Sequence, residues 1–245
     1  MSGWLGGRVL ENRTWTETLF SLRVAAPPLR FEAGQFVRIA LDLGGQRIAR
    51  PFSFVNAPAD PVFEFYGVIV PEGPLSPHLA LLQKGDALWL ADNPSGFLVL
   101  SEVPPAEDLW LVATGTGIAP FLSILRTAAP WQRYRRVILV HAARRASELV
   151  YQDMIRELQS GKPQFSYVSF VSREKHAQSL AGRIPDAIRD GRLESAAQPI
   201  APERSQFMLC GNPAMLKDTA AVLAERGLRK NRRRTPGQIT VESFW

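Results

Sequence analysis

The chain has 245 residues, of which 46% are hydrophobic and 21% charged, and its formal net charge is +6. This is ordinary globular composition, and the length allows one large domain or two smaller ones with a core that needs no disulfide. The single cysteine, Cys210, excludes an intramolecular disulfide and any metal site built from several cysteines, so redox chemistry here would need an organic cofactor.

The first part of the chain, to about residue 100, has the pattern of an antiparallel β-barrel. Short apolar runs cover residues 36–41, 63–70 and 87–90, and turn-forming Gly, Pro and Asp residues separate them. Several short strands at this spacing are typical of a barrel. One helix is predicted within it, with Ser76 as its N-cap and Pro77 as its first helical residue.

The second part of the chain alternates between strand and helix patterns. Strands are predicted at 109–113, 137–141, 165–171, 206–210 and 239–241, and helices at 118–128, 147–159, 184–190 and 213–226. This alternation indicates βαβ units and a parallel, doubly wound sheet. A polar, Pro-rich join at 101–105 separates the two parts, so we expect domains at 1–100 and 101–245.

The Arg-Pro-Phe-Ser sequence at 50–53 combines three useful groups on one strand. Arg50 and Phe52 share a face, and Ser53 points to the other. A guanidinium suits a pyrophosphate, an aromatic ring stacks on a flat heterocycle, and a hydroxyl can bond a ring nitrogen. The alternative is an edge strand with a surface Arg and a core Phe. Similarly, residues 73–76 fit either an anion site at a helix start or a simple cap.

A glycine-rich turn at 114–120 follows an apolar strand and opens a helix. Gly115 and Gly117 allow the backbone to approach a phosphate, and the helix start supplies N–H donors. Pro120 stands where the full Gly-x-Gly-x-x-Gly pattern has a glycine, and a plain tight turn is the alternative. The strand–turn–helix context favours a dinucleotide site.

Basic residues recur after the later strands of this part: Arg144, Arg145, Arg173 and Arg183. Ligands bind beyond the carboxyl ends of parallel strands, so these arginines favour a ribose 2′-phosphate, with surface charge as the alternative. The turn after Cys210 can also lie against a ligand, although the cysteine itself could equally be core filler. An apolar C-terminus implies docking, either on a flavin or adenine ring or in the core.

The remaining sequence features argue against a metal site, a nucleic-acid-binding surface and a membrane segment. His141 is interpreted as structural, and no metal-ligand spacing is present. The densest basic cluster, at 229–234, fits a solvated loop best, docking of an acidic protein second, and a nucleic-acid surface third because no aromatic residues are interleaved with it. The N-terminus has no signal-peptide pattern and no apolar run is long enough to span a bilayer, so we expect a cytoplasmic protein without membrane contact.

The order of these motifs, with the aromatic C-terminus, resembles the ferredoxin–NADP reductases, and most of all the bacterial flavodoxin/ferredoxin reductases. The resemblance runs essentially end to end. It implies an FAD-binding barrel at 1–100 and an NADP-binding domain at 101–245, in a monomer whose partner is the acidic protein ferredoxin or flavodoxin. Hydride would pass from NADPH to FAD and electrons singly to the acceptor. A reductase of free flavins or of an oxygenase component on the same fold is the alternative.

The resemblance also implies roles for individual residues. Ser53, Cys210, Glu242 and Phe244 would take part in catalysis. FAD would be bound by Arg50, Pro51, Phe52, Ser53, Tyr66, Val68, Gly73, Leu75, Ser76, Thr116, Phe244 and Trp245. NADP would be bound by Gly115, Gly117, Arg144, Ser172, Arg173, Arg183, Gly211 and Asn212. Thr116 would also face the nicotinamide and the NADP pyrophosphate. Phe52 stands where the family usually has Tyr, so ring stacking survives but any hydrogen bond from a phenol is lost.

Overall fold

The computed structural model describes residues 3–243, and its contacts group the chain into two compact units. Unit 1 is Met1–Val99 with Ala119–Thr127, and unit 2 is Leu100–Ile118 with Ala128–Trp245. The chain first passes between the units close to the predicted join at 101–105. Residues 119–127, predicted as part of the second domain, group with unit 1 by contact.

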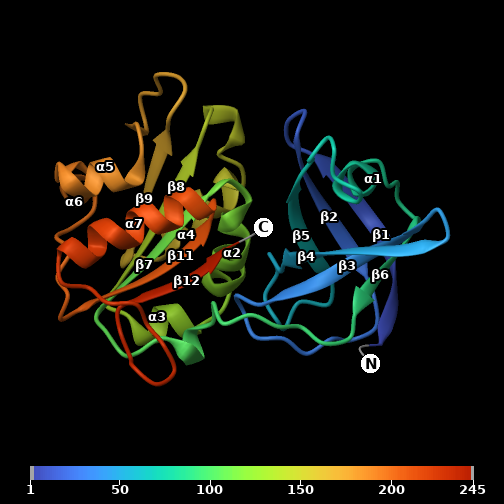
Figure 1. Ribbon diagram of the computed structural model, residues 1–245, viewed down its shortest axis with the longest axis horizontal. Coiled ribbons are helices and arrows are strands. Elements are labelled where there is room, and N and C mark those ends of the chain that lie inside the picture. Colours follow the sequence, from blue (N-terminus) through green and yellow to red (C-terminus); the bar gives the residue numbers. More distant parts are fainter. Residues whose placement is uncertain (1–2, 244–245) are drawn as a thin grey trace. The chain divides into compact units, whose positions relative to one another are not determined.

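Unit 1 is built on a curled, six-stranded antiparallel sheet (Figure 1). Its strands are β1 (Trp4–Thr14), β2 (Leu19–Ala25), β3 (Phe36–Leu43), β4 (Gln46–Ser53), β5 (Phe63–Val68) and β6 (Ala87–Ala91), in the order β4-β3-β6-β1-β2-β5. The two edge strands meet through an antiparallel bridge between Phe54, just after β4, and Phe65 of β5. The predicted antiparallel barrel is therefore confirmed.

Aromatic packing fills the interior of unit 1 where the sheet closes. Phe54 is fully buried and stacks on Phe31 with the ring centroids 3.8 Å apart, while Phe63 and Phe65 pack against it at centroid distances of 5.8 and 5.3 Å. Burying an aromatic side chain of this kind contributes roughly 1.5–3 kcal/mol to folding. The closure thus holds the end of β4, which carries the Arg-Pro-Phe-Ser motif, against β5.

The short helix of unit 1, α1 (Ser76–Ala80), differs from its prediction at the start. Leu75 is the N-cap and no side chain caps the helix. The Ser76 hydroxyl instead accepts a hydrogen bond from the N–H of Val70 at 2.9 Å. The side-chain amide of Asn12, in β1, caps the C-terminal end of this helix. It donates to the carbonyl oxygens of Leu79, Ala80 and Leu82 at 2.8–3.2 Å. A residue far away in sequence therefore fixes the end of this helix, and no local sequence pattern signals that contact.

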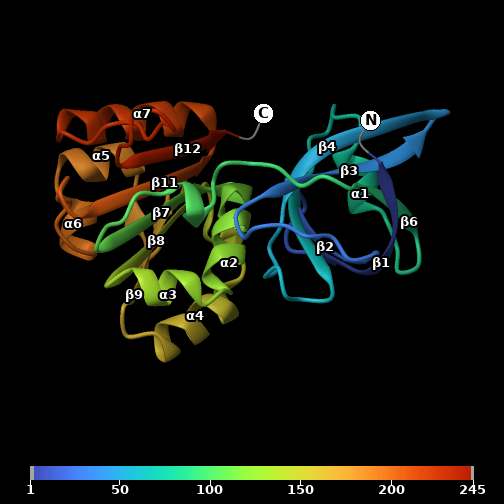
Figure 2. The ribbon, with the colours of Figure 1, turned by 90° about the horizontal axis from the view of Figure 1, so that it is seen from below.

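Unit 2 contains a parallel sheet, as predicted, with a sixth, two-residue strand that was not predicted, β10 (Leu180–Ala181). The strands are β7 (Asp108–Thr114), β8 (Arg136–Ala143), β9 (Phe165–Val171), β10 (Leu180–Ala181), β11 (Ser205–Gly211) and β12 (Ile239–Ser243), in the order β10-β9-β8-β7-β11-β12. Figure 2 shows helices α5 (Ile184–Arg189) and α7 (Pro213–Glu225) on one side of the sheet, and α3 (Ala129–Arg133) and α4 (Gln152–Gly161) on the other. The sheet is doubly wound.

The other helical segments are short: α2 (Ala119–Leu125), α6 (Arg192–Ala196), and the 3-10 turns η1 (Leu100–Glu102), η2 (Gly115–Ile118) and η3 (Ala146–Glu148). The helix predicted at 147–159 begins later because Tyr151 has a φ of 60°, a left-handed conformation that a helix excludes. The helix predicted at 118–128 ends early, and the Thr127 hydroxyl bonds the Ile124 carbonyl there. Within residues 3–243, no helix has the length and apolar character to cross a bilayer.

Alternate residues of the parallel strands form the core beneath α5, α6 and α7. Trp110 of β7 stacks on Phe207 of β11 with 5.3 Å between the ring centroids, and both rings are fully buried. Ile188, Leu193 and Leu223 of the three helices belong to the same cluster. This core fixes β7 and β11 side by side, and the candidate nucleotide site lies at their carboxyl ends.

Candidate functional site

The strand order of unit 2 reverses direction between β7 and β11. The chain goes from β7 outward to β8, β9 and β10, then returns to β11 and β12 on the other side. In open α/β sheets, ligands bind beyond the carboxyl ends of the strands at such a switch point. The turn η2 follows β7, and the N-terminus of α7 follows β11. The predicted nucleotide-binding turn and the Gly211–Asn212 turn therefore belong to one edge of the sheet.

Close backbone packing joins these two turns. A Cβ on Gly117 would lie 2.5 Å from the carbonyl oxygen of Cys210, so only glycine fits there. Gly211 has a φ of +130°, and a Cβ on it would lie 2.3 Å from Thr114 Oγ1. That hydroxyl accepts a hydrogen bond from the N–H of Asn212 at 2.9 Å. The sequence prediction included these glycines and Asn212 but missed Thr114, which links the two strands.

Asn212 also caps α7. Its Oδ1 accepts hydrogen bonds from the N–H groups of Ala214 at 2.9 Å and Met215 at 3.4 Å. The two N–H groups that this side chain satisfies are therefore no longer open to a ligand. We infer that Asn212 shapes the edge of the site chiefly through its backbone position.

Three of the predicted phosphate-binding arginines are not neutralised by a carboxylate of the described chain. Arg144, Arg173 and Arg183 are exposed, and within the described residues 3–243 their guanidinium groups have no ion-pair partner. Arg145, in contrast, pairs with Glu174 at 3.6 Å. Unpaired guanidinium groups at the carboxyl edge of a parallel sheet suit a phosphate ligand. The arrangement agrees with the predicted 2′-phosphate site, which stays a prediction.

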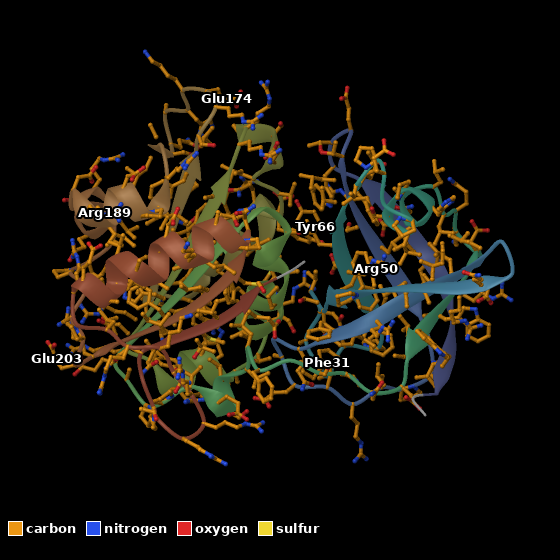
Figure 3. The ribbon with its side chains drawn as sticks, viewed as in Figure 1. Phe31, Arg50, Tyr66, Glu174, Arg189 and Glu203 are labelled. Atoms are coloured by element: carbon orange, nitrogen blue, oxygen red, sulfur yellow. The ribbon has the colours of Figure 1, made fainter. Side chains whose placement is uncertain are left out.

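Two carboxylates hold the loops that carry these arginines. Glu148 Oε2 accepts the N–H of Arg144 at 2.9 Å, and Glu174 Oε1 accepts the N–H of Ala146 at 2.7 Å. Figure 3 labels Glu174 in the loop that follows β9. The N–H of Arg173 donates to the carbonyl of Arg144 at 2.9 Å, which joins the loops after β8 and β9 directly. Sequence reasoning missed both glutamates because their bonds are to the backbone, and one of them comes from another loop.

Ser172 and Cys210 also lie at this edge. The N–H of Ser172 donates to the Ala143 carbonyl at 3.2 Å, and its hydroxyl donates to the same oxygen at 3.3 Å. Cys210 is fully buried in β11. Burial, followed by the negative charge of Glu242, raises the pKa of the Cys210 thiol well above its usual range. Cys210 is therefore a neutral thiol at physiological pH and does not serve as a thiolate nucleophile.

The sheet register places several polar residues in one row. Ser169, His141, Ala113, Cys210 and Glu242 are successive partners across β9, β8, β7, β11 and β12. Register partners in a parallel sheet present their side chains to the same face. His141, interpreted from sequence as structural, therefore shares a face with the predicted catalytic residues Cys210 and Glu242. Phe244 and Trp245, predicted to contact the flavin, lie outside the described residues.

Ser53 is the notable residue on unit 1. Its side chain is 2% exposed, and its hydroxyl has no hydrogen-bond partner among residues 3–243. Arg50 and Phe52 alternate with it along β4 as predicted, with Arg50 exposed and Phe52 half-buried. A buried hydroxyl left without a partner costs about 1–3 kcal/mol. This orphaned group fits a ligand that offers a hydrogen-bonding atom, as a flavin ring does.

Several other residues predicted to bind FAD are buried, half-buried or already hydrogen-bonded within unit 1. Leu75 and Tyr66 are 1% and 3% exposed, and Val68 is half-buried. Figure 3 labels Tyr66 and Arg50, which come from the two edge strands β5 and β4. The N–H of Gly73 donates to the Val70 carbonyl at 2.8 Å, so it is not free for a phosphate. Phosphate binding at 73–76 stays a prediction drawn from the resemblance.

The basic cluster at 229–234 lies away from the nucleotide edge. It belongs to the segment before β12, and Lys230 bridges to Ile239 at the amino end of that strand. Asn231 fixes the segment by donating to the Glu102 carbonyl at 2.8 Å and to Thr240 Oγ1 at 3.2 Å. Arg233 pairs with Glu102 at 3.2 Å. A group of three or more metal-ligating side chains does not occur within residues 3–243.

His141 makes folding stability depend on pH. Burial lowers the pKa of its imidazole from 6.5 to about 4, a shift that the hydrogen bond to Gly115 opposes. Between these two pKa values, His141 is protonated in the unfolded chain and neutral in the folded chain. The free energy of unfolding therefore rises with pH over this range. From pH 7 to about pH 4.5 we expect a loss of about 2 kcal/mol from this group.

Urea unfolding at several pH values measures this slope. The His141→Leu variant should lose this part of the acid destabilisation. Variants of His78 and His176, which are exposed, should keep it. An unchanged slope in His141→Leu would contradict the assignment.

Comparison with known proteins agrees with this architecture. Residues 111–221 match the family model of the oxidoreductase NAD-binding domain. The chain is 47% identical over the full length of both chains to the flavodoxin/ferredoxin–NADP reductase of Escherichia coli strain K12. It is 37% identical to the ferredoxin–NADP reductase of Pseudomonas aeruginosa, over 99% of this chain and 98% of the other.

A solved structure gives the same result. The crystal structure of a ferredoxin NADP+ reductase from Neisseria gonorrhoeae with bound FAD and NADP superposes with a TM-score of 0.94 at 35% identity, covering 99% of each chain. The fold and the nucleotide edge define an oxidoreductase with an NAD-binding domain. The identity over the whole chain is more specific: the protein belongs to the flavodoxin/ferredoxin–NADP reductase family.

Proposed function

We propose that the chain is an FAD-dependent oxidoreductase that transfers electrons between NADPH and ferredoxin or flavodoxin. The observation that carries this proposal is the full-length match to reductases of that name. The related structure from N. gonorrhoeae binds FAD and NADP, and both candidate sites of this chain have suitable chemistry. When bound, FAD supplies the conversion between a two-electron hydride and single electrons.

Unit 1 would hold the flavin with the motif on β4. Arg50 is exposed. Its Nη1 donates to the Ala49 carbonyl at 2.8 Å, which leaves its other N–H groups for the pyrophosphate, and Phe52 offers a half-buried ring for stacking. The Ser53 hydroxyl is already desolvated and has no partner within residues 3–243, so a hydrogen bond to the flavin near N5 would satisfy it. Because the hydroxyl is held at the end of a strand, it can orient the reacting ring without reorganising.

Unit 2 would hold NADPH along the carboxyl edge of its sheet. The turn Gly115–Ile118 provides backbone N–H groups for the pyrophosphate, and Gly117 lets this turn lie directly against Cys210 of β11. Arg144, Arg173 and Arg183 provide charge for the 2′-phosphate, which NADH lacks. Selection of NADPH over NADH is therefore assigned to the loops after β8 and β9 and to the start of α5.

The acceptor is proposed to be an acidic protein because the charge of the chain is unevenly divided. Unit 1 has equal numbers of basic and acidic residues, so the whole excess of +6 lies in unit 2. Attraction between opposite charges raises association rates and is screened by salt. Reduction of ferredoxin or flavodoxin should therefore slow as ionic strength rises. The same proposal includes a monomeric, cytoplasmic protein without nucleic-acid or membrane partners.

Replacing Ser53 tests the flavin site. In Ser53→Ala we expect hydride transfer from NADPH to slow by about 10- to 100-fold, the effect of one lost hydrogen bond in a preorganised site. The FAD content of the purified protein should be nearly unchanged, because the other contacts to the cofactor remain. Rapid mixing with NADPH, followed by flavin absorbance, measures the rate.

A buried serine elsewhere in the barrel serves as the control. Ser21 is 4% exposed and accepts a hydrogen bond from Trp15 Nε1, so Ser21→Ala removes a buried hydroxyl outside the motif. It should leave the hydride rate within about twofold of the wild type, since it has no partner in the site. An unchanged rate in Ser53→Ala with full FAD content would refute the role of this hydroxyl. A wild-type protein that takes up no flavin would refute the function itself.

A further inference from the structure

His141 is buried beside the strand that leads into the candidate nucleotide-binding turn. It lies in β8, in register with Ala113 of β7, and its side chain is fully buried. Ala113 is followed by Thr114 and then by the turn Gly115–Ile118. The imidazole therefore lies one strand away from the base of the candidate phosphate-binding turn.

One ring nitrogen of His141 bonds the backbone of that turn. Nε2 lies 3.1 Å from the carbonyl oxygen of Gly115. A carbonyl oxygen can only accept, so Nε2 carries the hydrogen and donates. The other nitrogen, Nδ1, is buried and has no hydrogen-bond partner within residues 3–243. An imidazolium would place a second, unsatisfied N–H there, so the geometry selects the neutral ring with its proton on Nε2.

The bonded carbonyl controls the direction of the next N–H group. The peptide between Gly115 and Thr116 is planar and trans, so its C=O and N–H point in opposite directions. A bond that draws the Gly115 carbonyl towards His141 therefore points the N–H of Thr116 away from that imidazole. Gly115 has a φ of +52°, a left-handed conformation that glycine adopts without the steric cost other residues would incur.

Contacts from a second strand restrain the other side of the turn. Thr114 Oγ1 accepts the N–H of Asn212 at 2.9 Å, and Gly117 packs directly on the Cys210 carbonyl. These contacts come from β11 and its following turn and do not involve the peptide after Gly115. His141 is the side chain of β8 that bonds that peptide.

We propose that His141 is a positioning residue, whose neutral imidazole holds the Gly115 carbonyl and thereby aims the Thr116 N–H at the dinucleotide pyrophosphate. The proposal rests on the proposed function, because it requires that the turn binds NADP. Burial, which lowers the pKa of His141 to about 4, keeps the ring neutral throughout the physiological range.

The test is the equilibrium affinity for NADP+ of the flavin-loaded protein, measured by titration calorimetry. His141→Leu removes the donor, and we expect the dissociation constant to rise about 5- to 10-fold, the effect of one neutral hydrogen bond. In His141→Gln the side-chain amide can occupy the place of Nε2 and donate to the same carbonyl, so the affinity should stay within about threefold of the wild type. The FAD content should be the same in all variants.

Leu139→Ala is the matched control for lost stability. Leu139 is fully buried two residues earlier in β8, on the same face as His141, and it offers no polar contact to the turn. It should lower the melting temperature without changing the affinity for NADP+. An affinity of His141→Leu equal to that of the wild type, or equal losses in His141→Leu and Leu139→Ala, would overturn the proposal.

A second measurement does not depend on any variant folding. A long-range proton–nitrogen NMR spectrum of the protein labelled at histidine should show His141 with its hydrogen on Nε2. A hydrogen on Nδ1, or on both nitrogens at neutral pH, would overturn the proposal. If the wild-type protein itself bound no NADP+ while the NMR spectrum showed the expected tautomer, the proposed function would fail, whereas the hydrogen bond would stand.

Discussion

Replacing Arg144 and Arg173 together with alanine should lower kcat/KM for NADPH by about 100- to 10,000-fold, because each charge-assisted hydrogen bond to a phosphate contributes about 1.5–3 kcal/mol. Both guanidinium groups are exposed and, within the described chain, free of ion pairs, so a phosphate can bind them without breaking an existing bridge. The loops are also preformed, since the N–H of Arg173 donates to the Arg144 carbonyl. Little ordering cost therefore opposes binding.

The same double variant should leave kcat/KM for NADH within about twofold, since NADH has no 2′-phosphate for these groups to contact. Steady-state kinetics with both nucleotides measure the preference, and most of the change should appear in KM for NADPH. Arg189→Ala is a suitable control, because Arg189 pairs with Asp186 and Glu225 on α5 and α7. Equal losses with NADPH and NADH would show that the arginines act through general charge and not through the 2′-phosphate.

The alternating strands and helices of residues 101–245 predicted five of the six strands of unit 2, because buried parallel strands are continuous apolar runs. The short edge strand β10, Leu180–Ala181, has no such run. The barrel was predicted from turn spacing, although β1 and β2 have no clear alternation in their sequence. Helix ends were predicted less well. Tyr151, with its left-handed backbone, and Leu75, the N-cap of α1, are both buried, and no local sequence pattern signals either role.

The residues of the candidate site likewise fall into some that the sequence predicted and some that it did not. Gly117 and Gly211 were predicted to let the backbone approach a ligand. In the structure, Gly117 lies against Cys210 and Gly211 against Thr114, so their approach to a ligand stays a prediction. Thr114, His141 and Glu174 were not assigned to the site. Each acts through a hydrogen bond to the backbone of another segment, and a polar side chain that does this has no signature in sequence. Register across the parallel strands is what brings them together.

The amino end of the sheet in unit 2 contains a buried ionic cluster that the proposed function does not use. Asp108 at the start of β7 is completely buried, and its carboxylate pairs with Arg136 at 2.7 Å and with Arg204 at 3.1 Å. The two guanidinium groups come from the start of β8 and from the residue before β11. The cluster thus ties three neighbouring strands together at the end opposite to the nucleotide edge.

Asp108→Asn should destabilise the protein by about 2–4 kcal/mol, because a buried carboxylate with two cations loses its charge while both guanidinium groups remain. The arginine side chains are 35% and 30% exposed, so water can solvate them in part, which holds the cost below that of a fully buried pair. Urea unfolding measures the loss, with Asp190→Asn as the control for an exposed pair. Since the cluster lies far from the nucleotide edge along the strands, the folded variant should keep its affinity for NADP+. A loss under 1 kcal/mol, or a large change in that affinity, would contradict a purely stabilising role.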